Sequence, residues 1–277
     1  MWKTVLVHAA PESVPGAQNA NAYAVSLAAD QKAELLAVAY AFRQPAPFGL
    51  RTGVDRSAAD SHEAAVRQAA EASIGSVARL CERQAVELED RIESCLAVDA
   101  PSTFAQYARV ADVTVIGSGH DEAGDSRELI EAALFQSGRP VILVPEAGVD
   151  AFAAKTIAIA WNDTPQSARA LADALPLIVR AKETHIVMVT DDDRLDAAMP
   201  AIEVAKYLAR HGAKAVVDEV QANGQSVRDA IVDRAVAAGA DLLVMGAYGH
   251  SRLREQILGG ATRDMIAGAP LPVLMSH

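Results

Sequence analysis

The chain has 277 residues, 51% of them hydrophobic and only 4% aromatic, with a formal net charge of −11 at pH 7. This length and apolar content suffice for one large or two ordinary domains. The acidic excess, without a cluster of Lys and Arg, argues against DNA, RNA or an anionic membrane as partner.

The sequence pattern predicts neither a membrane span nor a signal peptide. No apolar run approaches the roughly 20 residues of a membrane span, and the N-terminal apolar run is too short for a signal peptide. Cys81 and Cys95 belong to no C-x-x-C or Cys/His cluster, so we expect free thiols and no metal site of this kind. These features predict a soluble, cytoplasmic protein.

The first half of the chain begins with a strand-like run, Lys3-Thr4-Val5-Leu6-Val7. Between Phe42 and Val66 it carries a long insertion whose prolines and glycines predict a surface loop, followed by an Ala-rich helix after Ser57. The insertion holds no chemically suggestive residues. We interpret it as a connection, although a lid over a site is an alternative.

Three segments of the first half recur in the second half. Lys3–Val7 returns as Lys155–Ile159, Asp112–Gly117 as Asp241–Gly246, and Arg139–Leu143 as Leu271–Met275. Repetition at this scale indicates two copies of one structural unit. We place the copies at residues 1–148 and 153–277, joined by a short linker that keeps them within reach of one another.

Each copy alternates strand and helix. In the second copy we expect strands near 155–161, 184–190, 214–220, 241–246 and 272–276, with helices near 165–180, 195–211, 225–239 and 260–268. Such alternation implies right-handed crossovers and parallel strands. The fold class is therefore α/β, with two tandem Rossmann-like domains, each a five-stranded parallel sheet with helices on both faces.

The end of the first strand of the second copy prepares a helix start. Pro165 suits the first helical turn, and Thr164 or Asp163 can act as its N-cap. After the second strand come three acids at 191–193. These acids are better explained by solvation or helix capping than by a metal ion.

A glycine pattern follows the buried strand at 242–245. Gly246 and Gly249 are separated by two residues, nine more residues lead to Gly259 and Gly260, and Ala261 and Thr262 open a helix. Glycines before a helix leave backbone N–H groups uncovered, and the helix dipole adds positive potential. We therefore expect a phosphate group as the ligand of this loop. The pattern matches neither the P-loop nor the G-x-G-x-x-G fingerprint.

This Gly-2x-Gly-9x-Gly spacing resembles the phosphate loop of the universal stress protein family, and the repeated strands extend the resemblance over nearly the whole chain. It implies the family's adenine nucleotide alpha hydrolase-like fold and ATP, accompanied by Mg²⁺, as ligand. In that family a residue after the first strand contacts ribose or adenine, and the second strand lays an apolar side chain on adenine. The matching positions are Asn162 and Val189.

The resemblance also implies that the two copies pair within the chain through their last strands, at 140–145 and 272–276, and leaves a homodimer open. In the first copy Arg127 and Glu128 stand where Gly259 and Gly260 stand in the second, and Ala10 matches Asn162. A carboxylate against phosphates is repulsive. We therefore expect one nucleotide per chain, in the second copy.

Three functions remain open. The first is an adenine-nucleotide-binding regulatory or stress-response protein, in which any ATP turnover is slow because no water-activating residue is evident. The second is a structural dimerisation protein without a nucleotide. The third is a nucleotide-dependent transferase or hydrolase, since fold alone does not fix function. No catalytic base, nucleophile or metal set favours the enzyme.

Overall fold

The computed structural model describes residues 1–14, 16–43, 56–118, 125–146, 148–149, 151–190, 200–247 and 261–277. The first half of the chain contributes five strands and four α-helices within these ranges. They are β1 Thr4–His8, α1 Ala17–Gln31, β2 Glu34–Phe42, α2 Arg56–Gln84, β3 Leu88–Cys95, α3 Ala100–Val110, β4 Val113–Gly117, α4 Asp125–Gln136 and β5 Val141–Val144.

The second half repeats this alternation. Its elements are β6 Thr156–Ala160, α5 Pro165–Ile178, β7 Glu183–Val189, α6 Ala201–Arg210, β8 Ala215–Val220, α7 Val227–Ala237, β9 Leu242–Gly246, α9 Ala261–Ala267 and β10 Val273–Ser276. The predicted strands and helices of this half are confirmed to within a few residues, except that the predicted helix start at 195 lies outside the described residues. The helix expected after the insertion is also confirmed, as α2.

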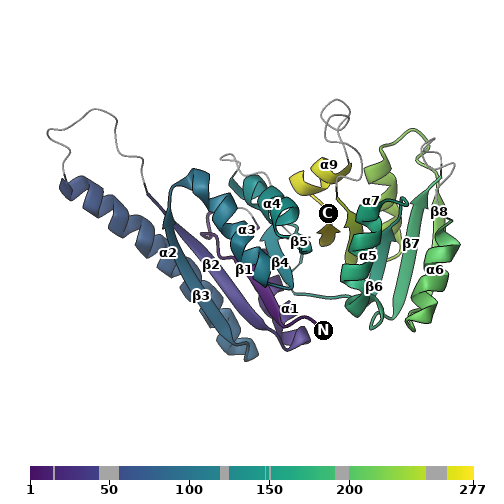
Figure 1. Ribbon diagram of the computed structural model, residues 1–277, viewed down its shortest axis with the longest axis horizontal. Coiled ribbons are helices and arrows are strands. Elements are labelled where there is room, and N and C mark those ends of the chain that lie inside the picture. Colours follow the sequence, from purple (N-terminus) through teal and green to yellow (C-terminus); the bar gives the residue numbers. More distant parts are fainter. Residues whose placement is uncertain are drawn as a thin grey trace.

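The ten strands form one continuous sheet in the order β3-β2-β1-β4-β5-β10-β9-β6-β7-β8. Within each half all neighbouring strands are parallel, whereas β5 and β10 pair antiparallel, with Ile142 opposite Leu274. The order reads the same from both edges, so a pseudo-two-fold axis passes between β5 and β10 (Figure 1). The predicted pairing of the copies through their last strands is therefore confirmed, and it merges the two five-stranded sheets into one.

Two apolar layers lie on the two faces of this sheet. One face is covered by α1, α2, α5 and α6, which bury side chains such as Tyr23, Leu171 and Val204. The other face is covered by α3, α4, α7 and α9, which bury Phe104 and Met265 among others. Strand residues alternate between the layers because successive side chains point to opposite faces. Both faces being covered explains the nearly unbroken apolar runs in the strands.

The repeated aspartates have the same structural role in both halves. Asp112 Oδ2 accepts hydrogen bonds from the backbone N–H groups of Lys3 and Thr4, at 2.6 and 3.1 Å. Asp241 Oδ2 does the same for Lys155 and Thr156, at 2.8 and 2.9 Å. Each carboxylate satisfies donors at the start of the first strand of its half. The sequence repeat thus records a shared way of fixing the central strand of each sheet.

Side chains also tie the halves together. On one side Arg180 donates to both carboxylate oxygens of Asp30, at 3.0 and 2.9 Å. Near the junction of β5 and β10, the rings of Phe135 and His277 pack edge to face with centroids 4.9 Å apart. The short linker is anchored as well, because Phe152 packs edge to face on Tyr23 of α1. These contacts connect the two halves in addition to the pairing of β5 with β10.

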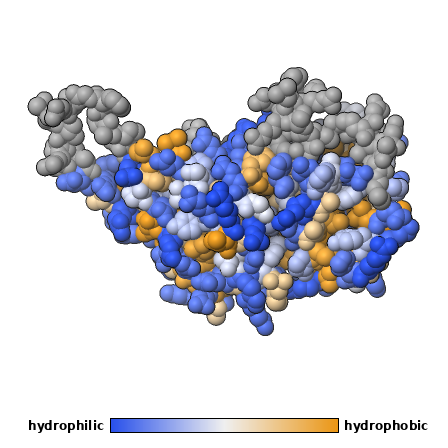
Figure 2. Space-filling model, in the orientation of Figure 1, coloured by the Kyte–Doolittle hydropathy of each residue, from blue (hydrophilic) through white to orange (hydrophobic). Residues whose placement is uncertain are grey.

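The surface in Figure 2 is mainly hydrophilic, with apolar residues in small separate groups. Among the described residues, the larger exposed apolar side chains are scattered over several elements rather than gathered on one. None of the described helices has both the length and the apolar character needed to span a membrane. Cys81 and Cys95 are free thiols, as predicted.

Candidate functional site

The predicted site residues that the structure describes lie where strands of the second half end. Asn162 follows the end of β6, Val189 ends β7, Gly246 ends β9, and Ala261 and Thr262 open α9. In a parallel sheet the carboxyl ends of neighbouring strands meet at one edge, which is where α/β folds bind ligands. Gly249, Gly259 and Gly260 lie outside the described residues, so their predicted contacts with phosphate stay predictions.

Asn162 belongs to the turn that leads from β6 into α5. Its Oδ1 accepts a hydrogen bond from the hydroxyl of Thr164 at 2.8 Å. Thr164 is the N-cap of α5 and forms a capping box with Ser167, and Pro165 occupies the first turn. The predicted helix start is confirmed, with Thr164 rather than Asp163 as the cap. The capping box holds the Asn162 turn at the edge of the site.

Gly246 is required for the close approach of α5 to β9. A Cβ atom at this position would lie 2.5 Å from the backbone N of Ser167 and 2.6 Å from the carbonyl carbon of Gln166. Gly117 holds the corresponding place in the first half, where a Cβ would lie 3.1 Å from backbone atoms of Gly16. The structure therefore gives the first glycine of the motif a packing role, which the sequence interpretation had missed.

Gln166 adds a polar group beside this contact. Its Oε1 is buried and has no hydrogen-bond partner among the described residues. A buried acceptor without a donor is costly, by roughly 1–3 kcal/mol. Gln166 sits in the first turn of α5, next to Gly246 and four residues after Asn162. An N–H or O–H group from a ligand at this edge would satisfy it.

The two halves differ in the side chains at the ends of their first two strands. His8 pairs with Val38, and Ala160 pairs with Val187, so His8 corresponds to Ala160. Two residues beyond Val38 on β2 and Val187 on β7, Tyr40 corresponds to Val189. The second half thus has two small apolar side chains where the first half has two rings.

In the first half these rings pack against one another and against α3. The centroid of the His8 ring lies 5.6 Å from that of Tyr40 and 5.9 Å from that of Phe104 on α3. The Tyr40 hydroxyl donates to the carbonyl of Ala100 at 3.2 Å, which holds the ring in place. In the second half, Ala160 and Val189 join the apolar layer under α7 and place no ring at the corresponding positions.

Burial lowers the pKa of His8 from its usual 6.5 to about 4. Between these two values the His8 imidazole is protonated in the unfolded chain but neutral in the folded chain. The free energy of unfolding therefore falls as pH falls from about 6.5 to about 4. At about 1.4 kcal/mol for each pKa unit, the largest loss is roughly 3 kcal/mol. We expect His8→Leu to remove this part of the acid sensitivity.

The measurement is urea unfolding of both proteins at pH 7.5, 5.5 and 4.5. The free energy of unfolding should fall more steeply with acidification in the wild type than in His8→Leu, because other groups titrate alike in both. Parallel pH profiles would contradict the assignment of a neutral imidazole packed against Tyr40 and Phe104.

Glu128, which was predicted to repel phosphate in the first half, lies in the first turn of α4 and is exposed to solvent. Its effect on a ligand stays a prediction. The side chains of His8 and Tyr40 give a second, independent reason for asymmetry. Comparing the ends of the second strands in the two repeats would have found this difference in the sequence.

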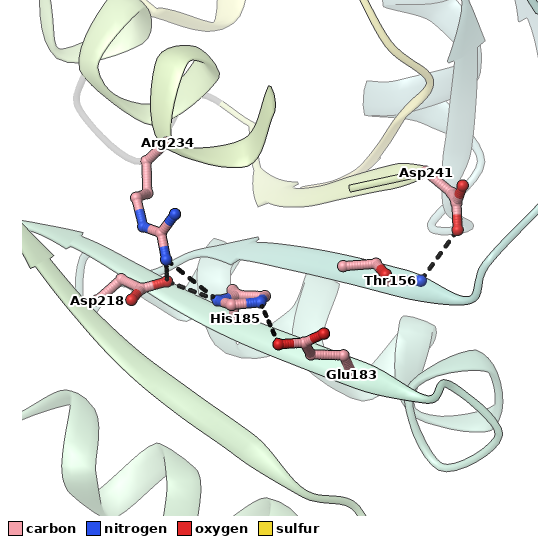
Figure 3. Close-up of polar contacts among 6 residues, drawn as sticks. All are labelled: Thr156, Glu183, His185, Asp218, Arg234 and Asp241. Atoms are coloured by element: carbon pink, nitrogen blue, oxygen red, sulfur yellow. Dashed lines mark hydrogen bonds and ion pairs between the residues drawn. The ribbon is translucent and has the colours of Figure 1, made fainter. Parts of the chain in front are cut away.

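A polar cluster that the sequence interpretation had missed lies under α7 (Figure 3). His185 on β7 is buried, with Nδ1 2.7 Å from Asp218 Oδ2 and Nε2 3.1 Å from Glu183 Oε1. Arg234 on α7 forms an ion pair with Asp218 at 2.8 Å. His185 precedes the apolar run of β7 and Asp218 follows the apolar run of β8, so the pattern of buried strands hid these two residues. The cluster joins α7 to the outer strands.

Two opposing effects set the pKa of Asp218. Burial by itself would raise it, but hydrogen bonds from Arg234 and His185, together with the positive charge of Arg234, outweigh burial and hold the pKa below its usual 3.8. The carboxylate is therefore charged at neutral pH. Among the described residues, no group of three or more His, Cys, Asp and Glu is arranged to hold a metal ion.

The architecture defines a class: a pseudo-symmetric pair of Rossmann-like units joined through their last strands. Residues 153–277 match the model of the universal stress protein family. A universal stress protein of Synechocystis sp. is 33% identical over 91 residues, which cover 32% of this chain and 31% of that protein. The chain thus spans about a third of the length of this curated relative. The predicted resemblance to the universal stress protein family is thus confirmed.

Solved structures extend the likeness in fold to the whole chain. A universal stress protein from Archaeoglobus fulgidus superposes with a TM-score of 0.70 at 16% identity, covering 98% of this chain and 97% of that one. A protein described as a putative universal stress protein, from Pseudomonas aeruginosa, gives 0.57 at 14% identity over 99% and 93%. At these identities the likeness shows the fold alone. It confirms the predicted tandem arrangement.

Proposed function

We propose that the chain is a regulatory stress-response protein that binds one adenine nucleotide, ATP with Mg²⁺, in its second half. The observation that carries this proposal is the difference between the side chains at corresponding strand ends. The second half has the smaller apolar side chains of Ala160 and Val189 at the positions where the first half has the rings of His8 and Tyr40. Only the second half also carries the Gly-2x-Gly-9x-Gly spacing.

The polar groups beside these strand ends support a nucleotide. The Asn162 amide offers both a donor and an acceptor to a base or a ribose hydroxyl. Gln166 Oε1 offers a buried acceptor that lacks a donor among the described residues. Mg²⁺ would arrive with the triphosphate, since it is commonly held by phosphates and water with few carboxylates.

We propose binding rather than turnover as the function. The apolar cluster that contains Ala160 and Val189 also contains Val187, Ile231 and Met245. None of these can act as a general base or stabilise a developing charge. A nucleotide held here would act by shifting the protein between ligand-bound and ligand-free states.

The test transfers the ring pair into the second half. In Ala160→His/Val189→Tyr, we expect ATP affinity to fall at least about tenfold, the equivalent of roughly 1.4 kcal/mol. Calorimetry with Mg·ATP should give one site per chain for the wild type. The control is His8→Ala/Tyr40→Val, which changes the corresponding pair in the first half and should leave the affinity of the second half unchanged.

Other outcomes point to other functions. A stoichiometry of two, or full affinity in Ala160→His/Val189→Tyr, contradicts the placement of the site. No nucleotide binding by the wild type, and none released on denaturing the purified protein, favours the structural dimerisation alternative. Circular dichroism of each variant distinguishes a loss of nucleotide binding from a loss of the folded structure.

A further inference from the structure

A cavity lies at the amino ends of strands in the second half, at the junction with the first half. Its volume is about 290 Å³, and it is lined by Asp30, Phe152, Ala153, Ala154, Lys155, Leu177, Arg180 and Lys182. Lys155 and Lys182 directly precede β6 and β7, so the cavity faces the amino ends of the strands. The candidate nucleotide site lies at their carboxyl ends, a strand length away.

Both halves of the chain build this cavity. Asp30 comes from the end of α1 in the first half, and its carboxylate is engaged by the guanidinium of Arg180 from the second half. The linker forms another wall, where the backbone N–H of Phe152 donates to the hydroxyl of Ser26. The cavity exists only because the two copies are joined in this arrangement.

Positive charge gathers in the cavity although the chain is acidic overall. The backbones of Lys155 and Lys182 are adjacent, with Lys182 N donating to the Lys155 carbonyl at 2.8 Å. Among the described residues neither ammonium group has an ion-pair partner, and the only carboxylate in the lining, that of Asp30, already pairs with Arg180. The lining residues therefore carry three cationic side chains and the one carboxylate of Asp30; the carboxylate of Asp241, which accepts from the Lys155 backbone N–H at 2.8 Å, lies beside this lining.

The nearest acidic side chain along the chain does not neutralise these lysines. Glu183 follows Lys182, but its carboxylate contacts His185 on the face of the sheet that carries α7 (Figure 3). The cavity lies on the other face, against Leu177 of α5. Because successive strand residues point to opposite faces, the two charges are separated by the sheet.

We propose that this cavity binds a small phosphate-type dianion, either inorganic phosphate or the phosphate group of a small monoester, between the two halves. Two ammonium groups and a guanidinium supply the point charges and directional donors that phosphate recognition uses. A dianion would balance the excess charge of the lining. It would contact the linker and both halves, and therefore stabilise their junction by mass action.

The probe is sodium phosphate at pH 7.5, titrated by calorimetry against sodium chloride of equal ionic strength. We expect saturable binding on the order of 1 mM for the wild type. In Lys155→Gln/Lys182→Gln the affinity should fall at least tenfold. The matched control, Lys206→Gln/Lys214→Gln, removes the same charge from exposed positions on and after α6 and should bind as the wild type does.

Phenyl phosphate and phenyl sulfate in the same experiment distinguish the sources of the anion. Tighter binding of phenyl phosphate than of inorganic phosphate indicates a monoester, and the reverse indicates the free ion; equal binding of the sulfate overturns the choice of a dianion. Equal losses in both lysine pairs, or no loss in either, mean an adventitious ion only. Mg·ATP affinity should be unchanged in Lys155→Gln/Lys182→Gln, so this proposal can fail while the proposed function stands.

Discussion

Gly246→Ala is expected to lower the free energy of unfolding by about 3 kcal/mol or more, the upper range for overpacking a core. The added methyl would overlap Ser167 N at 2.5 Å and the Gln166 carbonyl carbon at 2.6 Å. These are backbone atoms of a capped helix start, so no side chain can rotate to relieve the overlap. The N-terminus of α5 must move away from β9.

This movement should also weaken nucleotide binding, because the same helix start positions Asn162 and Gln166. Urea unfolding and calorimetry with Mg·ATP measure the two effects. Alanine substitutions at two other glycines test whether the cost depends on how closely the added carbon approaches the backbone. Gly117→Ala, 3.1 Å from the backbone of Gly16, should cost less, and Gly268→Ala, with no atom within 4 Å of the added carbon, should stay within about 0.5 kcal/mol of the wild type. Any other order among the three contradicts close packing as the reason for Gly246.

Asp218→Asn is expected to cost roughly 3 kcal/mol, the lower end for removing one partner of a buried ion pair. Asparagine has nearly the same shape, but it leaves the guanidinium of Arg234 without its counter-charge. The Asp218 side chain is 13% exposed and that of Arg234 28%, so solvent screens the pair only in part. The readout is the free energy of unfolding at pH 7.

The pH dependence of this effect follows from the lowered pKa of Asp218. The folded carboxyl holds its proton less tightly than the unfolded one, so its contribution is present above the usual pKa of 3.8 and is lost as pH falls below it. The difference between wild type and Asp218→Asn should therefore shrink at acid pH. Glu183→Gln is the control: its side chain is 56% exposed, and its loss should cost under about 1 kcal/mol. Equal costs for the two variants would mean that the cluster does not depend on Asp218.

Much of the fold could be predicted because its determinants are local or repeated. Apolar runs such as Leu242–Met245 and the alternation with helices follow from backbone geometry and side-chain periodicity. The start of α5 at Pro165 follows from capping chemistry. The recurrence of Asp112 as Asp241 identified the two copies before any contact was known, and the structure gives both carboxylates the same two backbone donors.

The site could be predicted only in part. The positions of Asn162, Val189 and Gly246 at strand ends follow from the element order, which brings the carboxyl ends of parallel strands together. What the positions do was less accessible, because a glycine before a helix is compatible with both a ligand and a packing contact. The structure assigns Gly246 to packing against α5, and contact with phosphate by the later glycines remains a prediction.

By itself the sequence determined the α/β class, the duplication and the free thiols, since periodicity, capping and repeats can be read along the chain. The edge at which the copies pair was implied by the resemblance to the universal stress protein family. Only the tertiary structure decided which side chains meet across distant segments. Asp218, His185 and Arg234 come from three elements, His8 meets Phe104 across about a third of the chain, and Arg180 meets Asp30 across the junction of the halves. Such contacts depend on the order of strands in the sheet and the packing of helices on it, which no local pattern specifies.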